Sequence, residues 1–131
     1  MKLFVYGTLR RGLERHWLLQ NSSYLGDGTI RARLYDLGDY PGIKKGNGTV
    51  YGELYEVDAP TLARLDEEED YMPSCESQSL YLRRWVTVRD RNGKRQRAFA
   101  YFYNGTVCES RRIVHGDYCR YRHEKMLSSQ S

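Results

Sequence analysis

The sequence predicts an α+β domain built on a mixed sheet or a closed barrel. Its 131 residues suit one compact domain. At least five apolar or alternating runs bounded by Gly, Pro and Asn have the pattern of strands, and the twelve Tyr favour strands as well. Two helical patterns are interspersed among these runs, and this mixture favours the α+β class.

The amino-terminal segment begins with a short apolar run, Lys2–Tyr6, which stops at Gly7 and predicts a buried strand. Residues Glu14–Gln20 predict a short helix whose Trp17 and Leu18 face inward. The first strand begins too early to leave room for a signal peptide, and no apolar run approaches the roughly 20 residues that span a membrane. We therefore expect a soluble, cytoplasmic protein, either a monomer or a homodimer.

The middle of the chain predicts two further strands, Thr29–Leu37 and Thr49–Val57. The turn-rich stretch Gly38–Gly42 and the sequence Gly46–Gly48 separate them. Turn residues of this kind interrupt a strand, so we expect the first strand to end before Gly38 and the second to begin after Gly48.

A helix and a hairpin follow. Asp58 offers an N-cap, Pro60 stands where a first-turn proline is tolerated, and the helix is predicted to run to about Asp70. The strand-like segments 80–89 and 95–103 flank an Asn-Gly pair, which is a strong hairpin signal.

The remaining sequence defines the limits of the domain and its charge. We expect a single domain over residues 1–124 and a disordered tail over 125–131, which has little periodicity. The net charge of +4 divides unevenly: residues 1–81 carry 9 basic and 13 acidic side chains, whereas residues 82–131 carry 12 and 4. Three Cys without a C-x-x-C pair make a disulfide framework or a cysteine zinc site unexpected.

The most informative segment is the acidic helix that contains Leu62 and Glu69. At about 100° per residue, Leu65 lies roughly 60° and Glu69 roughly 20° from Leu62, so Glu69 continues the apolar stripe. A carboxylate on an apolar face loses hydration, which raises its pKa toward the range that a general acid/base requires. The alternative interpretation is that the helix ends before Glu69 and all five acids form one solvated run; Asp66 is interpreted as a structural partner of an Arg.

A second candidate feature is the loop that follows the first strand, Tyr6–Leu9. A strand that halts at Gly7 can turn the next peptide N–H groups toward one point, where they bind an anion or an oxyanion. The alternative is an ordinary turn. Tyr81 and Tyr103, on predicted strands, are interpreted as packing residues, with the lining of a pocket as the alternative.

Several motifs together resemble the gamma-glutamylcyclotransferase-like family, of the gamma-glutamylamine cyclotransferase type. Residues 4–12 resemble its Y-G-[ST]-L signature, and residues 65–71 resemble its L-D-x-x-E-x-Y helix. Further matching segments follow the same order over most of the chain: Leu34–Gly42, Val50–Val57, Leu80–Arg84 and Gly116–Tyr118.

The resemblance implies a small mixed β-barrel with flanking short helices and a pocket over the Y-G-[ST]-L loop. It implies that Glu69 is the catalytic acid/base and that Tyr6, Gly7, Thr8 and Leu9 bind the substrate. The implied reaction releases 5-oxoproline and a free amine from a gamma-glutamyl amine or gamma-glutamyl amino acid, and it requires neither a cofactor nor a metal.

Two other functions stay open at this point. One is a non-catalytic domain that binds a small acidic metabolite in the same pocket. The other is nucleic-acid binding through the basic second half of the chain, which we do not expect, because alternating strand positions and the tail carry much of that charge. A small-molecule gamma-glutamyl substrate is the expected partner, with no membrane contact.

Overall fold

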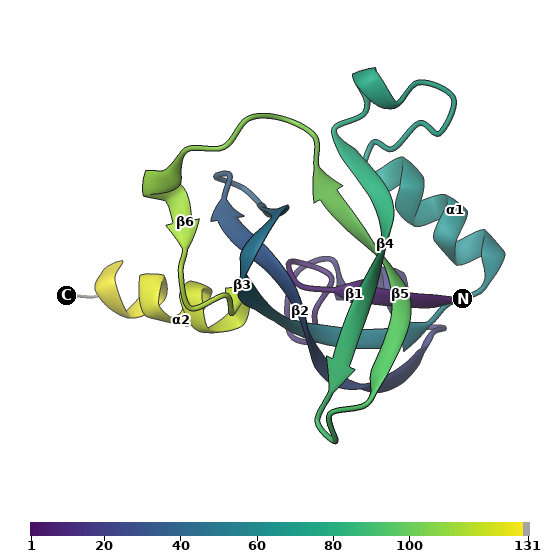
Figure 1. Cartoon of the computed structure of the whole chain (residues 1–131), viewed down its shortest axis with the longest axis horizontal. Coiled ribbons are helices and arrows are strands. Elements are labelled where there is room, and N and C mark those ends of the chain that lie inside the picture. The colour runs from purple at the N-terminus through teal and green to yellow at the C-terminus, as the bar shows by residue number, and fades with distance from the viewer. Residues whose placement is uncertain (130–131) are drawn as a thin grey trace.

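Strands dominate the computed structural model, which describes residues 1–129 (Figure 1). Within these residues the strands are β1 (Lys2–Val5), β2 (Ser23–Asp36), β3 (Pro41–Glu56), β4 (Tyr81–Asp90), β5 (Arg95–Tyr103) and β6 (Arg112–Ile113). The helices are the α-helices α1 (Ala59–Glu68) and α2 (Tyr118–Ser129) and the short 3-10 helices η1 (His16–Leu19), η2 (Glu76–Gln78) and η3 (Glu109–Arg111).

Five of these strands close into a barrel. The order β3-β1-β5-β4-β2 is completed by a pairing between β2 and β3, and β6 is added at the outer side of β2. The β1–β5 pair is parallel and the other pairs are antiparallel, so the sheet is mixed. The structure thus confirms the predicted α+β class and the mixed barrel with flanking short helices.

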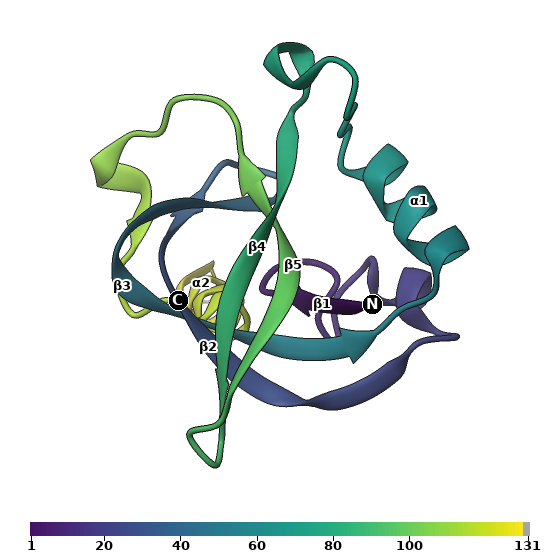
Figure 2. The same ribbon diagram turned by 45° about the vertical axis from the view of Figure 1, so that its right-hand side comes forward.

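Strand β1 is buried on both of its faces. Phe4 and Tyr6 belong to the cluster inside the barrel, whereas Leu3 and Val5 belong to a second cluster that includes Leu65 of α1. Since side chains alternate along a strand, burial on both faces explains why β1 is a continuous apolar run. In both views α1 lies outside the barrel (Figure 2).

Helix α1 begins as the sequence predicts. The Asp58 side chain accepts a hydrogen bond from the Thr61 N–H (2.8 Å), and Pro60 lies in the first turn. Leu62 and Leu65 are buried against the barrel. This packing fixes the direction in which the end of the helix points.

Three expectations about local structure differ from the structure. Trp17 is exposed (51%) and lies under the Arg64 guanidinium, while Leu18 is buried as expected. The segment is a 3-10 helix with three residues per turn, so an α-helical interpretation misplaces its faces. Strands β2 and β3 are longer than predicted, and Gly46–Gly48 lies inside β3 at a register shift, not in a turn.

The end of the chain differs as well. The sequence predicts a disordered tail over 125–131, whereas α2 continues to Ser129; Gln130 and Ser131 lie outside the described residues. Tyr121 donates a hydrogen bond to Asp36 (2.5 Å), and the Lys125 ammonium lies 3.4 Å from the same carboxylate. These contacts hold the helix on the barrel. No helix within residues 1–129 has the length and apolar character needed to cross a membrane.

Candidate active site

The carboxyl end of α1 places Glu69. Asp70 has a positive φ of 57°, its N–H donates to the Glu67 carbonyl (3.1 Å), and the Tyr71 N–H donates to the Asp66 carbonyl (2.8 Å). This pair of bonds is the Schellman arrangement that ends helices. The chain therefore turns away immediately after Glu69 and leaves its side chain at the wall of the barrel.

Glu69 differs from the other acids of its segment. It is 6% exposed, whereas Glu67 and Glu68 are exposed on the outer face of the helix. Asp66 is half-buried and accepts hydrogen bonds from Arg83 (2.5 Å) and from the Tyr101 hydroxyl (2.6 Å). The interpretation of one solvated acidic run is wrong, and Asp66 has the structural partners that the sequence predicts.

The loop after β1 brings Tyr6, Gly7, Thr8 and Leu9 to the same place, and all four are buried. In the part of the chain that the structure describes, the backbone N–H groups of Gly7, Thr8 and Leu9 have no hydrogen-bond acceptor. Buried N–H groups are rarely left unpaired, so three together mark a place for an anion or a carbonyl oxygen. Gly7 is needed here because a Cβ would lie 2.6 Å from Pro41.

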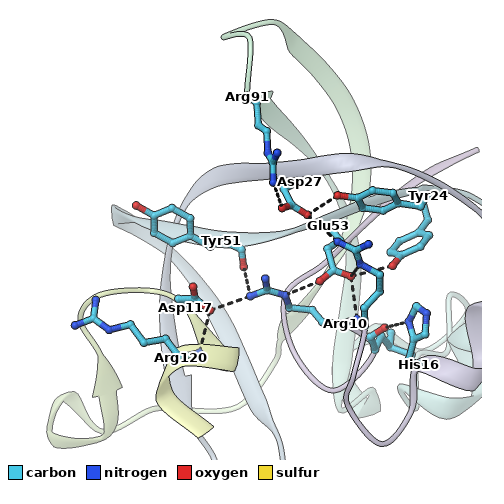
Figure 3. A network of polar contacts seen from close by, with 12 residues as sticks. Arg10, His16, Tyr24, Asp27, Tyr51, Glu53, Arg91, Asp117 and Arg120 are labelled. Carbon is cyan, nitrogen blue, oxygen red and sulfur yellow. Dashed lines mark hydrogen bonds and ion pairs between the residues drawn. The ribbon is translucent and has the colours of Figure 1, made fainter. Parts of the chain in front are cut away.

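A polar network behind the loop fixes its path (Figure 3). Glu53 of β3 is 3% exposed and accepts hydrogen bonds from Arg10 Nε (3.0 Å), the Arg11 N–H (3.0 Å) and the Tyr55 hydroxyl (2.8 Å). Arg10 also donates to Asp117 at the start of α2 (3.0 Å). This network was not predicted from the sequence; the signal for it was a charged residue, Glu53, inside a strand segment that is otherwise buried.

Arg15 joins the loop to Glu69, and our sequence analysis missed it. Its Nη2 donates to Oε1 of Glu69 (2.9 Å), and its Nε donates to the Thr8 hydroxyl (2.8 Å). The Arg15 N–H also donates to the Thr8 carbonyl (3.0 Å), which fixes the backbone from which this side chain extends. The contact with Glu69 spans 54 positions of sequence, and no local pattern signals it.

These groups surround one narrow pocket with a cavity volume of about 20 Å³. Tyr81 lines it and donates a hydrogen bond to the Pro41 carbonyl (2.6 Å), while Tyr103 packs against the Tyr81 ring from outside the pocket. Tyr6 donates to the Tyr101 carbonyl (2.7 Å). The lining residues are Phe4, Val5, Tyr6, Gly7, Thr8, Leu9, Arg15, Pro41, Glu69, Tyr81 and Tyr101.

The pocket raises the pKa of the Glu69 carboxyl above its ordinary value. Burial is the main cause, and the neighbouring Glu68 adds to it, whereas the charge and the hydrogen bond of Arg15 oppose it. Burial also raises the pKa of Tyr6, with contributions from Tyr81 and Glu69. Burial thus favours the protonated form of the Tyr6 phenol, and Glu69 is the one carboxyl among the residues that line this pocket.

The arrangement offers one carboxyl group, one guanidinium and three free amide donors around a small cavity. The carboxyl can accept and return a proton, and the donors can stabilise a developing negative charge. Cys75, Cys108 and Cys119 are free thiols outside this pocket. Within residues 1–129, no three His, Cys, Asp or Glu side chains are grouped so that they could hold a metal ion.

Comparison with known proteins gives a consistent family. The family model described as gamma-glutamyl cyclotransferase, AIG2-like, matches residues 3–120. A gamma-glutamylcyclotransferase family protein of Escherichia coli, YtfP, is 52% identical over 68 residues; the match covers 50% of this chain and 59% of the relative's length. The gamma-L-glutamyl-butirosin B gamma-glutamyl cyclotransferase of Niallia circulans is 38% identical over 104 residues, which cover 78% of this chain and 66% of that protein.

Solved structures share the fold. The solution structure of E. coli YtfP superposes with a TM-score of 0.66 at 36% identity, and the superposition covers 93% of this chain and 99% of that one. An uncharacterized protein from Pyrococcus horikoshii gives a TM-score of 0.72 at 30% identity, with 97% of each chain covered.

Proposed function

The chain belongs to the AIG2-like gamma-glutamyl cyclotransferase family, and on this premise we propose that it releases 5-oxoproline and a free amine from a gamma-glutamyl amine or a gamma-glutamyl amino acid. Family membership supports a cyclotransferase with a small gamma-glutamyl substrate. The observation that carries the proposal is the buried carboxyl of Glu69, which shares one pocket with the unpaired amides of Gly7–Leu9.

The reaction suits a site with few functional groups. The α-amino nitrogen of the substrate attacks its own γ-carbonyl carbon, so a C–N bond forms, a five-membered lactam closes, and the bond to the leaving amine breaks. Because nucleophile and carbonyl belong to one molecule, orientation alone contributes strongly; effective molarities of well-placed intramolecular reactions reach about 10⁵–10⁸ M. The protein then has to move two protons from the attacking nitrogen to the leaving nitrogen and to stabilise one oxyanion.

Glu69 moves the protons in this proposal. Its Oε1 accepts the bond from Arg15, and Oε2 has no partner among the described residues. The carboxylate takes one proton from the substrate ammonium before the attack and the second from the same nitrogen as the lactam closes. The nitrogen of the leaving amine receives both protons and departs as an ammonium. A pKa raised by burial suits a group that acts first as base and then as acid.

The test is 5-oxoproline release from a panel of gamma-glutamyl amines, gamma-glutamyl amino acids and glutathione, with the lactam separated from glutamate by chromatography and mass spectrometry. We expect Glu69→Gln to lower kcat/KM by about 10²–10⁴-fold, the usual contribution of a general acid/base. Glu68→Gln is the matched control, because its side chain is the adjacent, exposed carboxyl, and it should retain activity.

The same panel separates the rival function, a non-catalytic domain that binds a small acidic metabolite. That function predicts saturable binding of 5-oxoproline without any lactam from any substrate. Turnover that survives Glu69→Gln at the wild-type rate would remove the proposed base.

A further inference from the structure

The proposed proton transfer does not use the guanidinium of Arg15, although Arg15 lines the pocket. Its side chain is 28% exposed, and its charge lies beside the buried carboxyl of Glu69. We propose that Arg15 binds the α-carboxylate of the substrate, so that Arg15 and Glu69 together form a receptor for the zwitterionic α-carbon. This inference rests on the proposed function for the class of ligand.

The donors of Arg15 are only partly used. A guanidinium has five N–H groups, and the side-chain bonds to Glu69 and Thr8 use two of them. The others have no acceptor among the described residues. A guanidinium presents its donors as a planar fork that matches both oxygens of a carboxylate. Arg15 can therefore bind a second carboxylate while it keeps its hydrogen bonds to Glu69 and Thr8.

The order of charges also matches the substrate. The ammonium and the carboxylate of a gamma-glutamyl group are attached to the same carbon. In the pocket, Nη2 of Arg15 lies 2.9 Å from Oε1 of Glu69, so the complementary charges are also adjacent. An ammonium directed to Glu69 therefore brings its neighbouring carboxylate to Arg15. The pocket has no other Lys, Arg or His among its lining residues, so Arg15 is the one cation that can neutralise this carboxylate there.

This assignment determines what the loop amides do. From the sequence alone, the N–H groups of Gly7–Leu9 could hold either the substrate carboxylate or the oxyanion. If Arg15 holds the carboxylate, the amides are left for the γ-carbonyl oxygen, where negative charge develops as the ring closes. The Thr8 hydroxyl, which accepts a bond from Arg15, then keeps the cation beside the amides.

The experiment measures binding of two lactams that differ only in the carboxylate, 5-oxoproline and 2-pyrrolidinone, by NMR chemical-shift titration. For the wild-type chain we expect 5-oxoproline to bind about 10–100-fold more tightly, the range of a charge-assisted hydrogen bond. Arg15→Met should bring this ratio close to one. Arg15→Lys should restore part of the preference for 5-oxoproline, because the positive charge remains. The recovery should be incomplete, because lysine lacks the planar fork of donors.

Arg64→Met is the matched control. Arg64 is exposed on α1 and lies over Trp17, outside the pocket, so its removal should leave the ratio unchanged. A thermal unfolding curve for each variant verifies that the fold is intact. If Arg15 only positioned Glu69, Arg15→Met would change the affinities for both lactams alike and leave their ratio unchanged. An unchanged ratio in Arg15→Met therefore overturns the proposal. Failure of the wild-type chain to prefer 5-oxoproline over 2-pyrrolidinone overturns it as well.

A kinetic pair separates this proposal from the proposed function. The substrates are a gamma-glutamyl p-nitroanilide and its 4-aminobutyryl counterpart, which lacks the carboxylate and closes to 2-pyrrolidinone. Arg15→Met should raise KM for the first and leave KM for the second unchanged. If the wild-type chain forms no lactam but retains an Arg15-dependent preference for 5-oxoproline, the enzyme proposal fails and the carboxylate site stands. If it forms lactam and Arg15→Met keeps the wild-type preference, the reverse holds.

Discussion

Two buried glutamates, Glu53 and Glu69, bond to arginines that follow β1 in the chain. Glu53 is 3% exposed and Glu69 is 6% exposed. Both oxygens of Glu53 accept hydrogen bonds, from two arginines and a tyrosine (Figure 3). Glu69 accepts one bond on one oxygen. Burial is therefore common to both residues, and the number of partners separates the carboxyl that holds the loop from the one that can exchange a proton.

Glu53→Ala should give the largest effect on stability. It removes one of the two carboxylates that the partly buried Arg10 contacts at 3.0 Å, and it leaves the Arg11 N–H and the Tyr55 hydroxyl without their acceptor. Breaking a buried ion-pair network in this way costs about 3–5 kcal/mol of the free energy of unfolding. Chemical denaturation measures it. Glu56→Ala is the control, because Glu56 is half exposed and its one ion-pair partner among residues 1–129 is the amino group of Met1. Its loss should cost less than about 1 kcal/mol. Equal losses in both variants would contradict the structural role of Glu53.

Glu69→Gln should stabilise the folded chain near neutral pH, whereas Glu53→Ala should destabilise it. The folded state raises the pKa of Glu69, so it binds more protons than the unfolded state between the ordinary and the raised pKa. Stability of the wild-type chain therefore falls as pH rises through that window. We expect Glu69→Gln to match the wild-type chain in acid and to exceed it in stability above the window.

Denaturation curves recorded across the acid-to-neutral range test this comparison, with Glu68→Gln as the exposed control. A stability difference that is constant with pH would show that Glu69 has the same pKa in the folded and unfolded chain. The two glutamates would then no longer differ in the way that the proposed chemistry requires.

The sequence predicts the helix face on which Glu69 lies, but it does not predict that Arg15 contacts Glu69, and the reason is physical. Helical periodicity is a local property, so the position of Leu62 determines which face residue 69 takes, and the helix does extend far enough to keep it there. Arg15 lies on an irregular segment after the loop, where no period relates one side chain to the next. Its approach to Glu69 depends on how the loop packs against α1, and this tertiary information has no local signal.

The predicted lengths of β2 and β3 are too short because strand pairing, like the contact of Arg15, depends on tertiary structure. Gly and Lys residues between 42 and 48 are typical of turns, yet β3 continues through them because the barrel closes by pairing β3 with β2. A register shift between Arg31 and Arg33 accommodates the extra residues. Local composition therefore predicts the strands whose ends coincide with turns, such as β4 and β5, and underestimates the strand that closes the barrel.

Asp70→Gly should have the smallest effect, and it tests the helix end that directs Glu69 into the pocket. Asp70 has a φ of 57°, a left-handed conformation that costs a residue with a side chain about 1–2 kcal/mol and that Gly adopts freely. The unfolded chain gains about 0.5–1 kcal/mol of conformational freedom from Gly, so we expect a net gain in stability below about 1 kcal/mol. Activity should stay at the wild-type level, because the exposed Asp70 side chain is outside the pocket. A loss of lactam formation in a stably folded Asp70→Gly variant would mean that the carboxylate of Asp70, not only its backbone conformation, contributes to the position of Glu69.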